Sequence, residues 1–282
     1  MRTPDDLTIN PRDRRFDRSG SARHWVGGDP VATAFFNALS ITFPRGEAYF
    51  IDSVRAFRDD VPPRLAGEIA AFTKQEVLHS REHLAFNRQV TDHGYDVGLL
   101  DEDVTRLLDL ARSRPPIVRL AATMALEHFT AILAHELLRD PRHLERADAE
   151  AAALWRWHAV EEIEHKGVAY DTWLHATRDW SRGRRWRLKA LMMLIVTKNF
   201  LHHRSRGMLE LLRQDGITGL RAGMRLAAYA LVRPGMVRAV ARPWLAYFLP
   251  GFHPWKVDDR HLIDLHESAY VAARLPINAA TA

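Results

Sequence analysis

Two acid–histidine pairs constrain the fold of this chain more than any other feature of its sequence. Glu76 and His79 form one Glu-x-x-His pair, and Glu162 and His165 form the second. On an α-helix, residues at this spacing lie on one face about one turn apart, so both side chains of a pair can reach the same metal ion. The pairs therefore predict two helices with metal-binding faces.

Two further glutamates lie on predicted helices of their own. Glu47 lies in FPRGEAYFI and Glu127 in MALEHFTAI, so the order along the chain is Glu, Glu-x-x-His, Glu, Glu-x-x-His. Dinuclear metal sites in helical bundles use this set of ligands. Phe72 and Phe86 share the helical face of the first pair, which places the polar groups in apolar surroundings. Four carboxylates there would repel one another and be costly to desolvate, and two divalent cations would remove that problem.

A third histidine extends the second pair. His158 precedes Glu162 by four residues and lies on the same helical stripe. It is either a ligand that makes the site richer in nitrogen or an ordinary neighbour of the ligands, and His83 is its less favoured rival. No catalytic residue beyond the metal ligands and no organic cofactor site is predicted. The predicted metal ligands are Glu47, Glu76, His79, Glu127, His158, Glu162 and His165.

Other acidic residues close to the ligands are given supporting roles. Glu82, Glu161 and Glu164 face other directions than the ligands on an ideal helix, so we interpret them as surface or outer groups. Metal-bound imidazoles usually need a hydrogen-bonding partner on their second nitrogen. We assign that orienting role to Asp52 and Asp171.

Helix signals are dense and strand signals nearly absent, which predicts an all-α protein. Prolines that follow Asp29, Pro62 and Pro115 are typical of a first helical position. The predicted helices cover about 30–60, 63–93, 102–112, 116–139, 144–180, 184–214, 217–231 and 235–249. The predicted organisation is a poorly structured N-terminal arm (1–28), a metal-binding helical bundle (29–180), a basic, apolar helical extension packed on the bundle (181–275) and a tail (276–282).

The absence of cysteine excludes disulfides, thiolate zinc sites, iron–sulfur clusters and cysteine nucleophiles. The N-terminal segment is charged throughout and lacks the apolar core of a secretory signal. The longest uninterrupted apolar run, Ala190–Val196, is far shorter than a membrane span. We therefore expect a soluble cytoplasmic protein.

Charge is distributed unevenly along the chain. Residues 47–177 contain 15 Lys and Arg against 23 Asp and Glu, whereas residues 178–242 contain 15 Lys and Arg against three acidic residues. The basic region could form a solvated face or contact an anionic partner. Nucleic acid is not expected, because no reading motif accompanies the charge. Apolar stretches within 184–249 either cover the bundle or allow peripheral membrane contact.

Four segments carry a resemblance to a known family: FPRGE, QEVLHSREH, LEHFTA and WHAVEEIEHKGVAYD. Over roughly residues 7–270 the chain resembles bacterial proteins described as predicted metal-dependent hydrolases, which are similar to the ferritin-like superfamily. The resemblance implies a ferritin-like four-helix bundle with a helical C-terminal extension. His158 resembles the extra histidine of di-iron arylamine N-oxygenases. The ligands that the family resemblance implies are Glu47, Glu76, His79, Glu127, Glu162 and His165.

The ligand set favours a metal-dependent oxidoreductase over a hydrolase. Oxygen-rich ligands with a few imidazoles suit two iron ions, with manganese as an alternative, and paired metals with open positions can bind O₂. We therefore expect a di-iron oxidase or oxygenase, which would also need an electron donor. The alternatives are a hydrolase that uses a bimetallic hydroxide and a non-catalytic metal-binding protein. The oligomeric state stays open and includes a homodimer.

Aromatic residues near the first ligand indicate the kind of substrate. They favour an apolar or aromatic small molecule, although such residues also form ordinary cores. The aromatic residues near Glu47 are Phe35, Phe36, Phe43, Tyr49 and Phe50.

Overall fold

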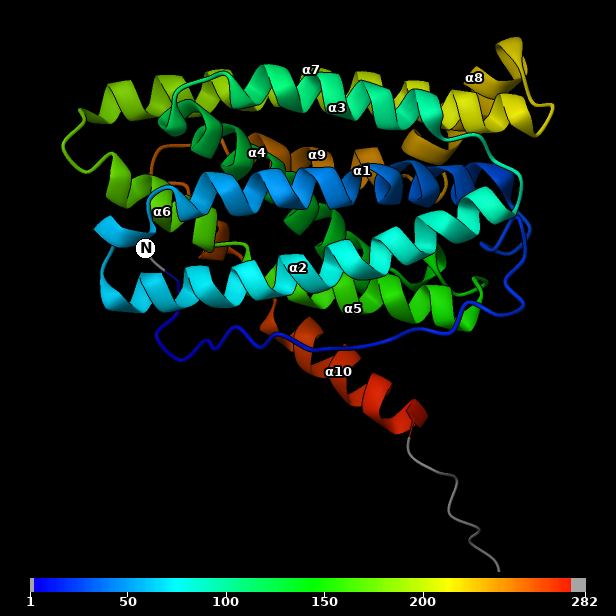
Figure 1. Ribbon diagram of the computed structural model, residues 1–282, viewed down its shortest axis with the longest axis horizontal. Coiled ribbons are helices and arrows are strands. Elements are labelled where there is room, and N and C mark those ends of the chain that lie inside the picture. Colours follow the sequence, from blue (N-terminus) through cyan, green and yellow to red (C-terminus); the bar gives the residue numbers. More distant parts are fainter. Residues whose placement is uncertain (1–2, 275–282) are drawn as a thin grey trace, which may run out of the picture.

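Four helices surround the centre of the protein: α1 (Pro30–Arg55), α2 (Pro63–Asp92), α4 (Pro116–Arg139) and α5 (Ala149–His165). The computed structural model describes residues 3–274, which contain helices and no β-strand. α1 packs on α2 and α4 packs on α5, and further contacts join the two pairs (Figure 1). The prediction of an all-α helical bundle is therefore confirmed.

The starts of the central helices follow from their sequence. Proline occupies the first position of α1, α2 and α4, where its missing N–H group leaves no hydrogen bond unmade. Asp29 caps α1, because its carboxylate accepts hydrogen bonds from two of the free N–H groups of the first turn. α1 continues through Pro44 and ends at Arg55, and a 3₁₀ turn over Arg58–Asp60 completes the predicted helical stretch.

The predicted helix over 144–180 is wrong in its extent, because it consists of α5 and the shorter α6 (Val168–Ala176). Gly167 lies at the break. A β-carbon at this position would lie 2.5 Å from Thr3 Oγ1 and 2.8 Å from Trp255 Nε1. The chain can pass so close to these two side chains only because glycine has no side chain of its own. Lys166 and Gly167 keep right-handed helical dihedral angles, so the interruption between α5 and α6 is local.

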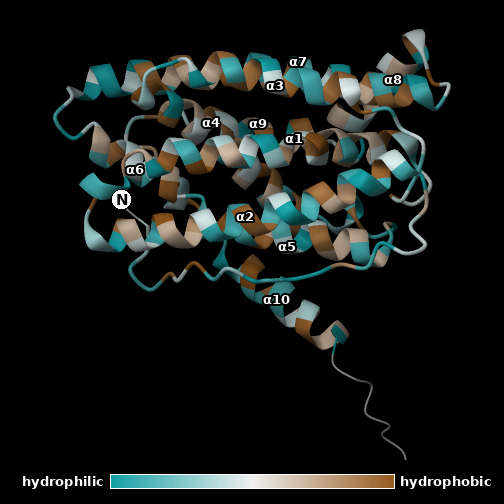
Figure 2. Ribbon diagram, in the orientation of Figure 1, coloured by the Kyte–Doolittle hydropathy of each residue, from teal (hydrophilic) through white to brown (hydrophobic). Residues whose placement is uncertain are grey.

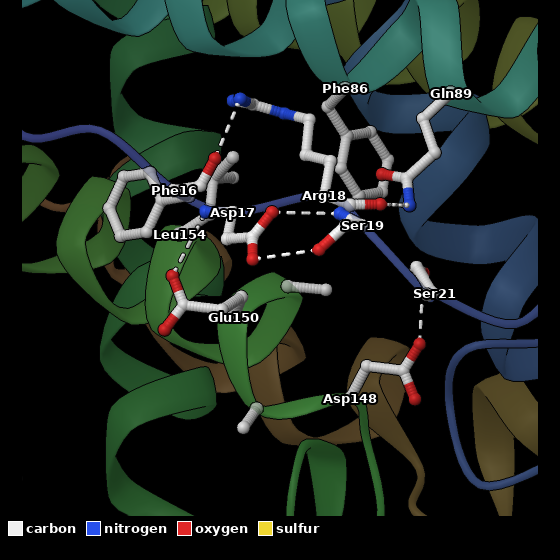
Figure 3. Close-up of a pocket in the computed structure, with 13 residues that line it drawn as sticks. Phe16, Asp17, Arg18, Ser19, Ser21, Phe86, Gln89, Asp148, Glu150 and Leu154 are labelled. Carbon is white, nitrogen blue, oxygen red and sulfur yellow. Dashed lines mark hydrogen bonds between the residues drawn. The ribbon is translucent and has the colours of Figure 1, made fainter.

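The N-terminal arm is irregular in its backbone but firmly attached, which differs from the expected poorly structured segment. Residues 3–28 run along α2 and α5 (Figure 1). Arg18 forms an ion pair with Glu82 of α2. Ser21 Oγ donates a hydrogen bond of 2.9 Å to Asp148 at the start of α5, beside a pocket between the arm and α5 (Figure 3). Carboxylates of the bundle hold the arm because its arginines supply the opposite charge.

The C-terminal helices pack directly against the bundle. α7 lies against α1, α3 and α4, α9 packs on α4, and α10 packs on α5. α8 contacts both α7 and α9. The predicted tail, 276–282, lies outside the described residues. The bounds of these helices are α3 (Gly98–Arg112), α7 (Arg182–Gln214), α8 (Gly219–Leu231), α9 (Met236–Ala246) and α10 (Arg260–Arg274).

Apolar residues recur along α7 and α8 as well as along the central helices (Figure 2). Among the described residues, α4 is the one helix that is long and apolar enough to cross a membrane. However, 67% of its most apolar window is buried inside the protein. This burial is typical of the core helix of a bundle. The expectation of a cytoplasmic protein is not contradicted and stays a prediction.

The contact at Gly167 generates a prediction about stability. Gly167→Ala should lower the free energy of unfolding by about 1–3 kcal/mol, because the added methyl group overlaps two side chains. Gly183→Ala in α7 is the control, since a β-carbon there meets no atom within 4 Å. Urea denaturation of both variants measures the difference. Equal stability of the two variants would contradict the assignment of a packing role to Gly167.

Candidate metal centre

Six buried side chains meet between α1, α2, α4 and α5 with polar atoms that no protein group satisfies. All six are at most 4% exposed. Each unpaired buried polar atom costs about 1–3 kcal/mol, so a set of this size requires partners from outside the chain. The donor chemistry, carboxylate and imidazole, fits divalent metal ions. The unpaired atoms are Glu47 Oε1, both carboxylate oxygens of Glu76 and of Glu127, His79 Nδ1, Glu162 Oε2 and His165 Nε2.

The distances within this ligand cluster fit two neighbouring ions. His165 Nε2 lies 3.3 Å from Glu76 Oε1 and 3.5 Å from the nearest oxygen of Glu127. Glu47, Glu76 and His79 form a second group whose ligand atoms lie within 4.8 Å of one another. Glu76 belongs to both groups. The cluster therefore brings six of the seven predicted ligands together, and the dinuclear site stays a prediction.

Burial and neighbouring charges compete in the electrostatics of the ligand cluster. Burial raises the pKa of Glu47 and Glu76 well above the usual range and that of Glu127 to about 8. Burial opposes the charge of His165, but the carboxylates of Glu162 and Glu127 outweigh it and raise the pKa of His165 to about 9. A metal ion that binds these groups must displace protons, which links metal affinity to pH.

Each histidine ligand is oriented by a residue from the facing helix. His79 Nε2 lies 3.0 Å from Glu161 Oε2, and His165 Nδ1 lies 3.0 Å from Gln75 Oε1. These acceptors hold the hydrogen-bearing nitrogen of each ring and leave the other nitrogen for a metal. Each orienting residue directly precedes the glutamate of a Glu-x-x-His pair, so the repeated unit is Gln/Glu-Glu-x-x-His. That repeat was the signal that could have identified them.

The supporting roles predicted from the sequence are wrong only in part. Glu161, Glu164 and Glu82 are not surface groups, since they are buried at 3% exposure or less and pair with arginines of the arm. The alternative of groups just outside the ligands agrees with the contact between Glu161 and His79. Asp171 does not reach a ligand histidine, since it accepts hydrogen bonds from Thr3 and pairs with His253. Asp52 likewise makes no side-chain contact with a ligand imidazole among the described hydrogen bonds. The position of a residue on its own helix could not show that arginines of the N-terminal arm would pair with these glutamates.

The arm completes the surroundings of the cluster through Arg12. Its guanidinium donates to both oxygens of Glu164, at 2.6 and 3.0 Å, and its backbone N–H donates to Glu161 at 2.8 Å. Gln75 Nε2 donates to the same Glu164 at 2.8 Å. Both orienting residues are therefore fixed by one network that starts on the arm.

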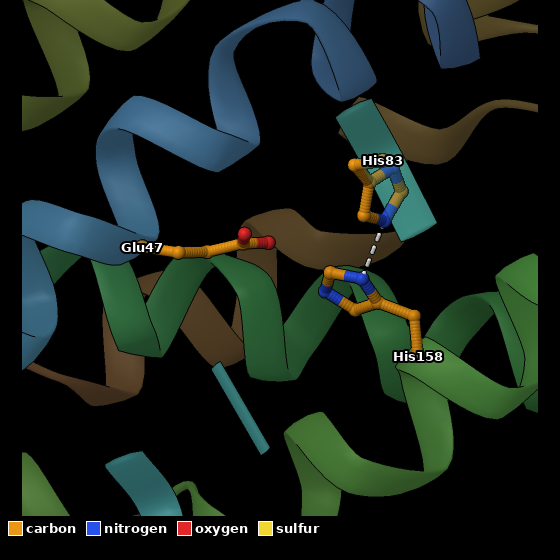
Figure 4. Close-up of side chains that lie close together, drawn as sticks. All are labelled: Glu47, His83 and His158. Carbon is orange, nitrogen blue, oxygen red and sulfur yellow. Dashed lines mark hydrogen bonds between the residues drawn. The ribbon is translucent and has the colours of Figure 1, made fainter. Parts of the chain in front are cut away.

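His158 and His83 form a row that ends at the ligand cluster (Figure 4). Ser40 Oγ donates to Asn87 and so can accept from His83 Nδ1, at 2.8 Å. His83 Nε2 is then the acceptor for His158 Nδ1, at 2.7 Å. The second nitrogen of His158, Nε2, lies 2.9 Å from Glu162 Oε1 in the ligand cluster.

This row contains both candidate histidines. His83 contacts Ser40 and His158 through its two nitrogens, and His158 contacts His83 and Glu162. Both histidines form a buried group of possible metal ligands with Glu47, and His158 forms another with His79 and Glu162. The choice between them as a seventh ligand stays a prediction.

A second buried group of potential ligands lies at the end of α4. Glu136, Asp140 and His143 offer ligand atoms within 4.8 Å of one another. Arg139 pairs with Glu136 at 2.6 Å and Arg142 pairs with Asp140 at 2.5 Å, so only the two His143 nitrogens lack hydrogen-bond partners. We place the candidate centre at the ligand cluster, because carboxylates there have no compensating arginine among the described residues.

The raised pKa values predict how the stability of the metal-free protein depends on pH. Between pH 6.5 and 8 the folded state should retain protons on Glu127 and His165 that the unfolded chain has lost. Stability should therefore fall as pH rises through this window, and added Mn²⁺ should stabilise the protein more at pH 8 than at pH 6.5. Urea denaturation with and without chelator measures both effects. Glu127→Gln should flatten the profile, and a metal-free stability that rises through the window would contradict the prediction.

The orienting role of Gln75 can be tested by metal affinity. Gln75→Leu keeps the approximate volume but removes the acceptor for His165 Nδ1, so affinity should fall about 10–100-fold. Gln89→Leu on the same helix is the matched control, because Gln89 contacts the arm at Arg18. Competition with a chromophoric chelator reports the affinity, and circular dichroism verifies folding. Identical affinities for the two variants would rule out this role.

Comparison with known proteins identifies the family of this chain. The family model described as predicted metal-dependent hydrolase matches residues 10–258, whereas no curated protein and no solved structure matches. The description overturns the expectation that an oxidoreductase is favoured over a hydrolase, and hydrolysis requires no electron donor. The ferritin-like resemblance stays a prediction, because no solved structure supports it. Since the match covers most of its length, the chain belongs to the predicted metal-dependent hydrolase family.

Proposed function

We propose that this protein is a hydrolase that acts on an apolar small molecule with two divalent metal ions held between α1, α2, α4 and α5. The observation that carries the proposal is the set of unpaired carboxylate and imidazole atoms in the ligand cluster. The family description supports hydrolysis as the reaction class. When bound, paired metal ions supply a hydroxide nucleophile and neutralise the charge that develops on the substrate.

The proposed ions are iron or manganese. Four carboxylates and two imidazoles make an oxygen-rich ligand set, which suits both metals. The protein's own part is to hold these ligands in place. Gln75 and Glu161 fix the two rings, and Ser80 Oγ donates to Glu47 Oε2 at 2.6 Å.

An apolar pocket beside the ligand cluster supports the proposed class of substrate. Its polar lining residues include His158 and Glu162, so it reaches the metal ligands. The pocket has a volume of about 40 Å³, so as it stands it admits only a small apolar group beside Glu162. The apolar side chains around it exclude water, which strengthens electrostatic interactions at the reacting bond. Its lining includes Phe35, Phe36, Phe43, Leu137, Phe200 and Met236.

The aromatic residues that led us to expect such a substrate divide into two groups. Phe35, Phe36 and Phe43 line the pocket. Tyr49 and Phe50 are buried in the core instead, on the part of α1 that continues past Glu47. The substrate proposal therefore rests on the first group alone.

Metal content and hydrolysis together test the proposed function. The purified protein should bind about two ions per chain and hydrolyse p-nitrophenyl esters, with short acyl chains favoured because the apolar pocket is small. Glu76→Gln should reduce the metal content and lower kcat/KM about 100-fold, because Glu76 contributes to both groups of ligands. Plasma mass spectrometry and steady-state assays measure these quantities.

The control is Glu102→Gln, an acid of α3 that lies outside the ligand cluster. Two bound ions without hydrolysis of any ester or amide would favour the non-catalytic alternative. Hydrolysis that survives both chelation and Glu76→Gln would contradict the proposal directly.

A further inference from the structure

Large apolar side chains gather on the solvent side of α7, α8 and α9. Of the 18 large apolar residues that are exposed in the described chain, 12 lie between Trp186 and Leu249. Contiguous exposed apolar surface of this kind is typical of an interaction site. The 12 residues are Trp186, Leu191, Leu194, Ile195, Leu201, Leu209, Leu220, Met224, Leu231, Val232, Leu245 and Leu249.

α8 shows this most clearly, because its solvent face is apolar. Leu220, Met224 and Leu231 lie on one side of the helix and are 80%, 58% and 52% exposed. Ala222 and Tyr229 face the protein and are buried. A surface helix of a soluble protein normally turns its polar side to water, and α8 has apolar residues on both sides.

We call the exposed apolar residues of α7, α8 and α9 the outer apolar face. α8 packs against both α7 and α9. Two side-chain hydrogen bonds link α7 to the end of α9: Trp244 Nε1 donates to Thr197 Oγ1 at 2.9 Å, and Lys189 Nζ donates to the carbonyl of Tyr247 at 2.6 Å. The helices that bear these exposed residues are therefore neighbours in the fold.

Positive charge surrounds these apolar residues. Residues 182–249 contain 14 Lys and Arg and two acidic residues. Both acids are engaged, since Glu210 pairs with Arg213 and Asp215 pairs with Arg23. Arg187, Lys198 and Arg242 are exposed basic residues of α7 and α9. They form no ion pair with an acidic residue in the described part of the chain. The face thus combines apolar insertion groups with uncompensated positive charge.

This combination selects among possible partners. A second copy of the chain would bring the same positive charge against the first, and a nucleic acid would match the charge but not the leucines. An anionic bilayer matches both features, because acyl chains accept the apolar side chains and headgroups attract the basic ones. We propose that the outer apolar face docks this protein peripherally on an anionic lipid membrane.

Docking would also place the apolar pocket close to the membrane. Phe200 of α7 and Met236 of α9 line that pocket from beneath the outer apolar face. An apolar molecule dissolved in the bilayer would then have a short path to Glu162. This consequence rests on the proposed hydrolase function, whereas the docking itself does not.

Vesicle flotation of the full chain tests the docking. The protein should float with vesicles of phosphatidylglycerol and phosphatidylcholine at low salt, and binding should be about tenfold weaker with phosphatidylcholine alone or at high salt. Leu220→Glu should reduce binding at least about fivefold, because it places a negative charge at the most exposed apolar residue. Leu265→Glu on α10, 61% exposed and outside the face, is the matched control and should bind as the unmodified protein does.

Three results would overturn the proposal. The first is the absence of flotation with anionic vesicles at low salt. The second is equal loss of binding in Leu220→Glu and Leu265→Glu. The third is a dimer in light scattering that Leu220→Glu dissociates, which would make the face an interface between copies. Both variants should keep the metal content and ester hydrolysis of the unmodified protein in the absence of vesicles, so failure to dock is distinguishable from failure of the proposed function.

Discussion

The buried carboxylates of the ligand cluster impose the main physical constraint on this protein. Glu47, Glu76, Glu127 and Glu162 come from four helices and meet in an apolar interior, where isolated negative charges would be very costly. Protons can satisfy them only in part, whereas two divalent ions can compensate them together. Because each helix contributes ligands to one point, metal binding couples the packing of all four helices. Any change in the packing of these four helices would therefore also change the distances between the ligands.

Reciprocal support gives the site its rigidity. Gln75 on α2 orients a histidine of α5, and Glu161 on α5 orients a histidine of α2. Arg12 of the N-terminal arm then holds Glu161 and, through Glu164, Gln75. A network that crosses from helix to helix prevents either one from sliding without loss of several hydrogen bonds. The family match begins at residue 10 and so includes this arm, which fits its role in supporting the centre.

The C-terminal helices α7 and α9 pack on the side of the bundle that α1 and α4 form. They cover α1 and α4, contribute Phe200 and Met236 to the apolar pocket, and turn an apolar, basic face outward. The family match continues to residue 258 and therefore includes α7, α8 and α9. The matched residues thus include both the ligand cluster and the basic helices. The pocket lies between them and connects the proposed chemistry with the proposed membrane contact.

Local spacing determined much of this protein from the sequence alone. The two Glu-x-x-His pairs, Glu47 and Glu127 predicted the helices that meet and six side chains of the cluster, because helical periodicity is a property of neighbouring residues. Tertiary structure decided what lies around them. Arg12 reaches Glu161 and Glu164 across about 150 positions, and Thr3 and Trp255 pack closely against Gly167 between α5 and α6. The sequence could not indicate the burial of Glu161 or the contact of His158 with His83, since both depend on distances between helices that no local pattern contains.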